Sequence, residues 1–106
     1  MNSYSIIWTQ SALDDLYTIV NFISKYSLTL AEEVAIRVLF RTRQLKEFPF
    51  SGQIEMLLQK SKYEYRYIVQ GHSKLIYRIE NQIIYIERIF DTRQNPKKLK
   101  RKLVKK

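Results

Sequence analysis

The feature that most constrains the fold is a series of three strand-like runs in the second half of the chain, at 63–69, 74–80 and 83–90. The first two runs alternate at period two, which is typical of strands with two distinct faces. The third run is nearly continuous in apolar residues, as expected for a strand that is covered on both faces. The segments between the runs, Gln-Gly-His-Ser and Asn-Gln, consist of turn-forming residues. The sequence therefore predicts an antiparallel meander.

The alternation also predicts which side chains share a face of this sheet. We expect the core to receive the tyrosines of one face of the first run, which carries Tyr63, Tyr65, Tyr67 and Val69. In normal register, the meander sets four basic side chains side by side: Arg66, Lys74, Arg78 and Arg93. The alternative is a solvated sheet face with ordinary charges.

The first half of the chain reads as one strand and two helices. Residues 4–8 predict a short strand, and the segment 11–26 begins with Ser-x-x-Asp, which resembles a helical capping box. A second helix is predicted over 29–47, where Thr-x-x-Glu begins an apolar stripe. Phe-Pro-Phe-Ser-Gly at 48–52 ends it, and Leu57 and Leu58 extend an earlier strand in one interpretation. The predicted order is β-α-α-β-β-β, an α+β fold in which an N-terminal helical hairpin covers one face of an antiparallel sheet.

Length and composition limit the classes of protein that fit. A chain of 106 residues fits one domain, predicted at 1–96, with a basic tail at 97–106. The chain contains no cysteine, which excludes disulfides, thiol catalysis and thiolate metal sites. It contains no apolar run of the roughly 18 residues that span a membrane, and its first residues lack a signal-peptide pattern. We expect a cytoplasmic protein without a membrane partner.

The net charge of +9 is concentrated at the C-terminal end. Seven of the 19 basic residues follow Pro96, which leaves 12 basic and 10 acidic residues before the tail. A tail of this kind predicts contact with a polyanion or an acidic protein, and the alternative is a solvated tail. The side chains predicted to contact nucleic acid are Arg78, Lys97, Lys98, Lys100 and Arg101.

The usual catalytic groups are sparse. The one histidine, His72, occupies a predicted turn, where a histidine is usually just exposed. We find no convincing Ser-His-Asp order, no metal-ligand spacing and no glycine-rich phosphate loop, so we expect neither a metal nor a cofactor. The remaining chemistry is cationic, because guanidinium groups bind phosphate and stabilise negative charge in a phosphoryl transition state.

Several short motifs occur in order along the chain: Trp8, Ala12-x-x-Asp15-Leu16-x-x-Ile19, Phe48-Pro49-x-x-Gly52, Tyr65-Arg66, Lys74-Leu75-Ile76-Tyr77 and Ile89-Phe90-Asp91-Thr92-Arg93-Gln94-Asn95-Pro96. Their order and spacing resemble the RelE/ParE superfamily of bacterial type II toxins. Members are encoded beside an antitoxin that wraps and neutralises them, so the resemblance implies a cognate antitoxin as a partner.

The resemblance implies one of two activities. RelE-like members cleave mRNA on the ribosome by attack of a 2′-hydroxyl on the adjacent phosphate, whereas ParE-like members poison DNA gyrase. For the nuclease, the matching positions are Arg66, Lys74 and Arg93, and Glu55 resembles the carboxylate base of one branch.

Both targets stay open from the sequence. Lysine stands at 74 where arginine is usual, Asp91 stands where many members carry a histidine, and Ile68 stands where another branch has a lysine. The helix pair and the Phe-Pro-x-x-Gly junction are ParE-like, while the high positive charge suits a ribosome or RNA partner. The alternatives to an active toxin are a non-catalytic nucleic-acid-binding module and an inactivated toxin relic.

Overall fold

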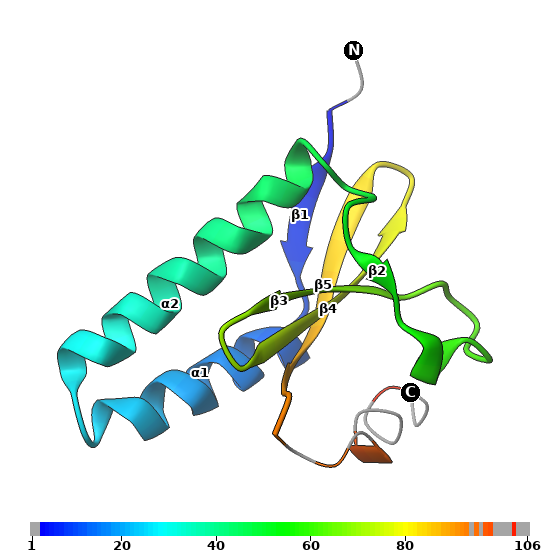
Figure 1. Ribbon diagram of the computed structural model, residues 1–106. Coiled ribbons are helices and arrows are strands. Elements are labelled where there is room, and N and C mark those ends of the chain that lie inside the picture. The colour runs from blue at the N-terminus through cyan, green and yellow to red at the C-terminus, as the bar shows by residue number, and fades with distance from the viewer. Residues whose placement is uncertain (1–2, 94, 96, 99–102, 104–106) are drawn as a thin grey trace.

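The computed structural model describes residues 3–93, 95, 97–98 and 103, and has the predicted α+β class. The chain forms two α-helices and a five-stranded sheet. Figure 1 shows the helices beside the sheet. The helices and strands are β1 (Ser5–Trp8), α1 (Gln10–Ser24), α2 (Leu28–Arg43), β2 (Gln53–Ile54), β3 (Arg66–Gln70), β4 (Ser73–Glu80) and β5 (Ile83–Asp91). Two short 3-10 helices, η1 (Gln44–Lys46) and η2 (Met56–Leu58), follow α2 and β2. None of the described helices is long and apolar enough to cross a membrane.

The sheet is mixed, with strand order β1-β5-β4-β3-β2. The predicted meander is present, because β3, β4 and β5 pair antiparallel through the two predicted turns. The prediction of a wholly antiparallel sheet is wrong, since β1 lies parallel to β5. The Thr9 N–H just beyond β1 donates to the carbonyl of Ile86 at 3.1 Å, which extends this parallel pairing to the start of α1.

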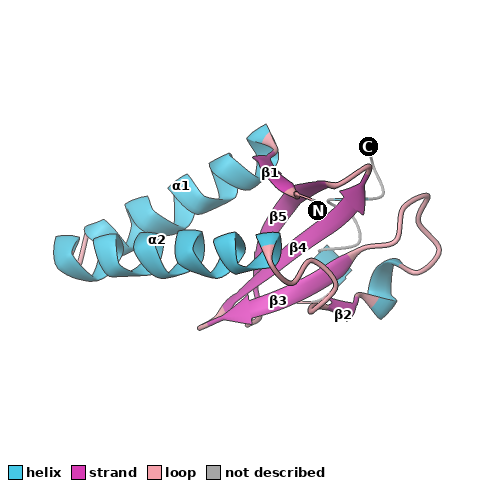
Figure 2. Cartoon of the chain, turned by 90° about the horizontal axis from the view of Figure 1, so that it is seen from above, coloured by secondary structure: helices cyan, strands magenta, loops and turns pink. Residues whose placement is uncertain are grey.

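Most of the core lies between the two helices and one face of the sheet. Figure 2 shows α1 and α2 side by side on the same side of the sheet. The helical segments contribute Ala12, Val38 and Leu45. The strands contribute Ile68, Leu75, Tyr77, Ile84, Ile86 and Ile89. Since all nine side chains are buried, this layer supplies most of the apolar burial that stabilises the fold.

A smaller apolar cluster lies on the other face of the sheet. It consists of Leu58, Tyr65, Ile76, Phe90 and Leu103, with Tyr67 packed against it. Of the tyrosines on the predicted face of the first run, Tyr65 is buried in this minor cluster and Tyr67 packs against it, whereas Ile68 from the opposite face enters the main core. Tyr63 and Val69 are exposed, and the strand begins at Arg66 instead of Tyr63. Leu57 and Leu58 lie in η2 and not in a strand.

The strand β5 contains a β-bulge and contributes side chains to the apolar clusters on both faces of the sheet. Ile76 of β4 pairs with Arg88, whereas the next residue, Tyr77, pairs with Ile86, so Glu87 is the additional residue. As a result, Ile86 and Ile89 both enter the main core although they are three positions apart. Since Phe90 enters the minor cluster, the prediction of a strand covered on both faces is confirmed.

Both helices begin before the predicted capping boxes. Thr9, and not Ser11, caps α1, because the Thr9 hydroxyl oxygen accepts from the N–H of Ala12 at 3.1 Å. Ser27, and not Thr29, caps α2 and accepts from the N–H of Leu30 at 3.1 Å. The Thr9 hydroxyl also donates to the carbonyls of Ile86 and Glu87, both at 3.1 Å. One side chain therefore both caps α1 and fastens it to the bulge.

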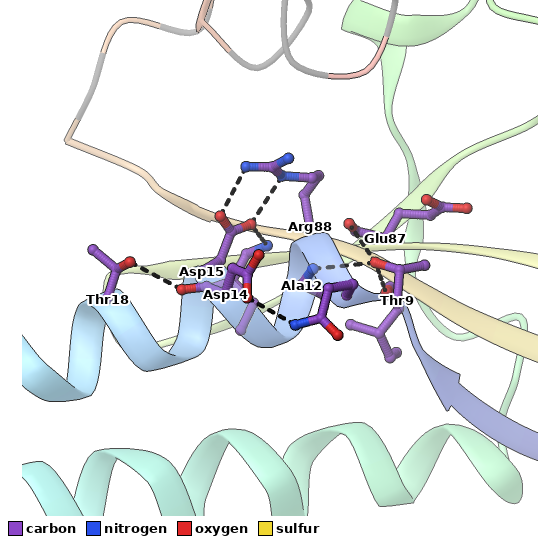
Figure 3. A network of polar contacts seen from close by, with 10 residues as sticks. Thr9, Ala12, Asp14, Asp15, Thr18, Glu87 and Arg88 are labelled. Carbon is purple, nitrogen blue, oxygen red and sulfur yellow. Dashed lines mark hydrogen bonds and ion pairs between the residues drawn. The ribbon is translucent and has the colours of Figure 1, made fainter. Parts of the chain in front are cut away.

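Asp15 makes a second link between α1 and β5. Its carboxylate accepts two hydrogen bonds from the Arg88 guanidinium, at 2.9 and 2.8 Å, and a third from the N–H of Ile89 at 2.9 Å (Figure 3). The side chains of Asp15 and Arg88 are 12% and 17% exposed, so the pair is largely shielded from water. This contact gives the aspartate of the Ala-x-x-Asp-Leu motif a structural role.

The Phe-Pro-x-x-Gly junction is held by Tyr77. The Tyr77 hydroxyl donates to the carbonyl of Pro49 at 2.8 Å and accepts from the N–H of Gly52 at 3.0 Å. A Cβ at residue 52 would lie 2.5 Å from the Tyr77 hydroxyl oxygen and 2.7 Å from the carbonyl oxygen of Tyr67. Glycine is therefore required at position 52 by the close approach of these two oxygens.

We predict that Gly52→Ala destabilises the protein by about 1–3 kcal/mol, the usual cost of forcing atoms into a packed site. Urea unfolding followed by circular dichroism measures this loss. The matched control is Ser51→Ala, which changes an exposed neighbour and should alter the free energy of unfolding by about 0.5 kcal/mol at most. Equal stability of the two variants would contradict the role assigned to Gly52.

We also predict that Asp15→Ala lowers the free energy of unfolding by about 2–3 kcal/mol, because it leaves the Arg88 guanidinium and the Ile89 N–H without their acceptor. Asp14→Ala is the control, since the exposed Asp14 side chain accepts only from Gln10 in the described structure. Thermal and urea unfolding should show a change of about 0.5 kcal/mol or less for Asp14→Ala. Two equal losses would show that the link between α1 and β5 is not specific to Asp15.

Candidate functional site

Two of the predicted site residues, Lys74 and Glu55, form an ion pair on the sheet face that carries the minor cluster. Glu55 lies between β2 and η2, and its carboxylate caps η2 by accepting from the N–H of Leu57 at 3.1 Å. Its side chain is 4% exposed, and its other carboxylate oxygen contacts the Lys74 ammonium. The Lys74 nitrogen also lies 4.2 Å from the centroid of the Tyr67 ring, a cation–π contact. Lysine and glutamate thus neutralise each other in a shielded position.

Arg66 lies on the opposite face of the sheet. It pairs in register with Tyr77, whose ring belongs to the main core, whereas Lys74 pairs with Val69. The Arg66 guanidinium donates to the carbonyl of Gly52 at 2.9 Å and lies 5.3 Å from the centroid of the Phe50 ring. Arg66 therefore stabilises the Phe-Pro-x-x-Gly junction and lies on the face of the sheet opposite the Lys74–Glu55 pair.

Arg78 is held by acidic and aromatic side chains on the Lys74 face. Its Nε donates to Glu87 at 2.7 Å, and a second nitrogen donates to Glu80. The guanidinium lies 4.2 Å from the ring centroids of both Tyr63 and Tyr85. Burial disfavours the charged form, but the hydrogen bonds to Glu87 and Glu80 outweigh it and raise the pKa of Arg78.

Arg93 lies just beyond β5 and lines a cavity that none of the other three predicted cations line. Its side chain is 67% exposed and donates to both carboxylate oxygens of Asp91, at 3.0 and 2.8 Å. Arg93 and Asp91 line a cavity of about 200 Å³ with His72 and with apolar side chains of α1 and α2. The hydrogen bonds from Arg93 lower the pKa of Asp91 to about 2.

The prediction that the sheet sets Arg66, Lys74, Arg78 and Arg93 side by side is therefore wrong for the full set, although Arg66 and Arg78 do line one hollow of about 220 Å³. The register of β3 with β4 places Arg66 and Lys74 on opposite faces, and Arg93 follows the last strand. Each of the four contacts a carboxylate within the described structure.

The structure describes only two of the four predicted nucleic-acid-binding residues of the tail. Lys97 and Lys98 are exposed and follow Asn95, whose side chain accepts from the N–H of Lys97 at 3.0 Å. Lys100 and Arg101 lie outside the described residues. The nucleic-acid contacts of all four stay a prediction. His72 is exposed in the β3–β4 turn, and no group of His, Asp or Glu side chains in the described parts of the chain could hold a metal ion.

A cationic region that the sequence reading left unassigned lies at the end of α2. Arg41, Arg43 and Lys46 have no carboxylate within salt-bridge distance among residues 3–93. They line a hollow of about 630 Å³ together with Phe40 and Phe48. The available signal was the segment 40–48, Phe-Arg-Thr-Arg-Gln-Leu-Lys-Glu-Phe, which places three basic residues between two phenylalanines.

We predict that Arg93→Gln raises the pKa of Asp91 from about 2 toward its ordinary value of 3.8. The folded pKa lies below the unfolded one, so the pair stabilises the protein above pH 3.8, and this contribution disappears as the pH falls toward 2. NMR titration of the Asp91 carboxyl measures the shift. An unchanged Asp91 titration would show that Arg93 does not hold this carboxylate in solution.

Comparisons with known proteins agree with the fold described above. A family model described as "ParE toxin of type II toxin-antitoxin system, parDE" matches residues 6–96. A solved structure titled "Chromosomal ParDE TA system from P. aeruginosa" is similar, with a TM-score of 0.69 and 17% sequence identity; the match covers 86% of this chain and 98% of that chain. At this identity the likeness shows the fold alone. No curated protein matches the chain.

The family model extends from β1 to beyond the end of β5 and includes both helices and the Phe-Pro-x-x-Gly junction. The predicted membership of the RelE/ParE superfamily is thereby confirmed, and the chain belongs to the ParE toxin family of type II toxin–antitoxin systems.

Proposed function

We propose that this protein is a growth-inhibiting toxin that poisons DNA gyrase and is neutralised by a cognate antitoxin in the cytoplasm. Membership of the ParE toxin family supports the role as a toxin with an antitoxin. The arrangement of the candidate catalytic side chains supports gyrase, and not mRNA, as the target. Arg66, Lys74 and Arg93 occupy three separate settings, each with a carboxylate neighbour.

This separation argues against ribosome-dependent mRNA cleavage. A phosphoryl-transfer site needs a base and transition-state cations that converge on one phosphate, within hydrogen-bond reach of the reacting atoms. Here Glu55 is 4% exposed and neutralised by Lys74, while Arg66 lies on the opposite face of the sheet. An activity that depends on binding to gyrase, and not on chemistry at a phosphate, places no such demand on these residues.

The surface of the helices supports a protein partner such as the antitoxin. Large apolar side chains are exposed along α1 and α2: Leu13, Tyr17, Phe22, Leu28, Leu30, Ile36, Leu39 and Phe40. An exposed apolar surface of this kind is typical of a protein–protein interface. We propose that residues 1–96 form the toxin domain and that the cations of 97–106 add attraction for an acidic partner.

The test compares purified protein in two assays. We expect inhibition of gyrase supercoiling with accumulation of cleaved DNA–gyrase complexes, and intact mRNA ends in a reconstituted translation reaction. Expression in bacteria should arrest growth, and co-expression of the adjacent antitoxin should relieve the arrest. Ribosome-dependent mRNA cleavage that disappears in Arg66→Ala would instead identify a RelE-like nuclease.

A double variant separates the two targets without disturbing the fold. In Glu55→Gln with Lys74→Met, both charges of the shielded pair are removed together, which costs far less stability than removing one. We expect gyrase inhibition within about twofold of the unmodified protein, because the pair has a structural role. A loss of toxicity in the folded double variant would contradict this assignment, and circular dichroism provides the folding control.

A further inference from the structure

The cations of the protein fall into two groups. Arg66, Lys74, Arg78, Arg88 and Arg93 each contact a carboxylate of the sheet or its neighbours. Arg41, Arg43 and Lys46, at the end of α2 and in η1, contact no carboxylate within the described structure, although Arg41 donates to the side-chain oxygen of Gln44 at 3.2 Å. Five exposed lysines also contact no carboxylate among the described residues (Lys25, Lys60, Lys62, Lys97 and Lys98), but Arg41, Arg43 and Lys46 are set apart because all three line one hollow.

Two exposed aromatic rings accompany these cations. Phe40 and Phe48 are 60% and 62% exposed and line the same hollow of about 630 Å³ as Arg41, Arg43 and Lys46. The other lining residues are Gln44, Ser51 and one acidic side chain, Glu47. The only apolar side chains that line the hollow are therefore aromatic.

Helix electrostatics explains only part of this arrangement. Basic residues in the last turn of a helix are favoured by the negative end of the helix dipole, which accounts for Arg41 and Arg43. It does not account for Phe48, which lies beyond η1, or for two large apolar rings left in water. Exposed rings beside unneutralised cations indicate a ligand that offers both flat apolar faces and negative charge.

We propose that this hollow binds single-stranded nucleic acid, with Arg41, Arg43 and Lys46 on the phosphates and Phe40 and Phe48 stacked on bases. Aromatic platforms interleaved with cations are the usual means of binding single strands without sequence preference. An acidic amphipathic helix fits less well, because it inserts aliphatic side chains and this hollow has no aliphatic wall. The proposal does not depend on the gyrase-poisoning activity, because binding to the hollow is measured without gyrase.

The first test is the salt dependence of binding. Full-length protein is titrated into a fluorescein-labelled oligo(dT) of about 20 nucleotides, and fluorescence anisotropy gives the dissociation constant at several salt concentrations. The double variant Arg43→Gln with Lys46→Gln should lower the slope of log affinity against log salt by about 1.4, since each phosphate contact to a single strand contributes about 0.7. The matched control is Lys25→Gln with Lys60→Gln, which removes two exposed charges outside the hollow and should leave the slope nearly unchanged.

The second test addresses stacking. Phe48→Leu keeps an apolar side chain but removes the ring, and it should weaken oligo(dT) binding about fivefold or more at constant salt. Phe22→Leu, an equally exposed phenylalanine of α1 outside the hollow, is the control and should bind as the unmodified protein does. Circular dichroism establishes that all variants are folded.

Three results would overturn the proposal. Equal binding by Phe48→Leu and the unmodified protein would exclude stacking, and an unchanged salt slope in the Arg43/Lys46 variant would exclude the phosphate contacts. Binding of a labelled poly-glutamate peptide that depends on these residues, with oligo(dT) binding unaffected, would assign the hollow to an acidic protein segment instead.

Discussion

The additional residue in β5 is the constraint on which the rest of the structure depends. Because Glu87 forms a bulge, Ile86 and Ile89 both face the helices, and the strand can fill two apolar clusters. Thr9 binds the carbonyls at the bulge, and Asp15 binds Arg88 and the next N–H. The start of α1 is thus attached to the sheet where β5 is irregular. The N-terminal strand and helix are positioned by hydrogen bonds to a site near the far end of the chain.

The basic side chains of this fold are of two kinds: some form ion pairs that stabilise the fold, and others are free of carboxylate partners within the described structure. Cations that emerge from the sheet meet carboxylates, as in the Lys74–Glu55 and Arg78–Glu87 pairs, where the acidic partners are nearly fully buried. Leaving either acid without its cation would cost far more than the pair itself contributes. Basic residues at the end of α2 meet no such partner within the described structure. The buried acids therefore identify Lys74 and Arg78 as cations with a structural role, whereas the cations at the end of α2 are left available to a partner.

Much of the fold could be predicted from local pattern, but the site could not. Period-two alternation and turn chemistry are local, so the three strands and their turns were correctly placed within a few residues. The face of the sheet on which each side chain lies was not predicted correctly. The alternation within a single strand does not reveal which face the helices cover, and the face of Arg66 follows only from its register with Tyr77. The helix N-caps are Thr9 and Ser27, and not the predicted Ser11 and Thr29, because the bulge and the helix–helix turn determine where each helix starts. The partners of Lys74 and Arg88 lie far away in sequence and follow from tertiary contacts alone.

The parallel pairing of β1 with β5 has a consequence for the order of folding. Thr9 and Ile86 are hydrogen-bonded across 77 residues, so the closing contact of the sheet is also among the most distant in the chain. Non-local pairings of this kind form late in folding, because the chain loses conformational entropy on closing a long loop before the contact contributes any stability. On the ribosome, the helices emerge before their sheet exists, and their inward faces stay uncovered until β5 has been synthesised. The nascent chain therefore acquires its native surface only near the end of translation.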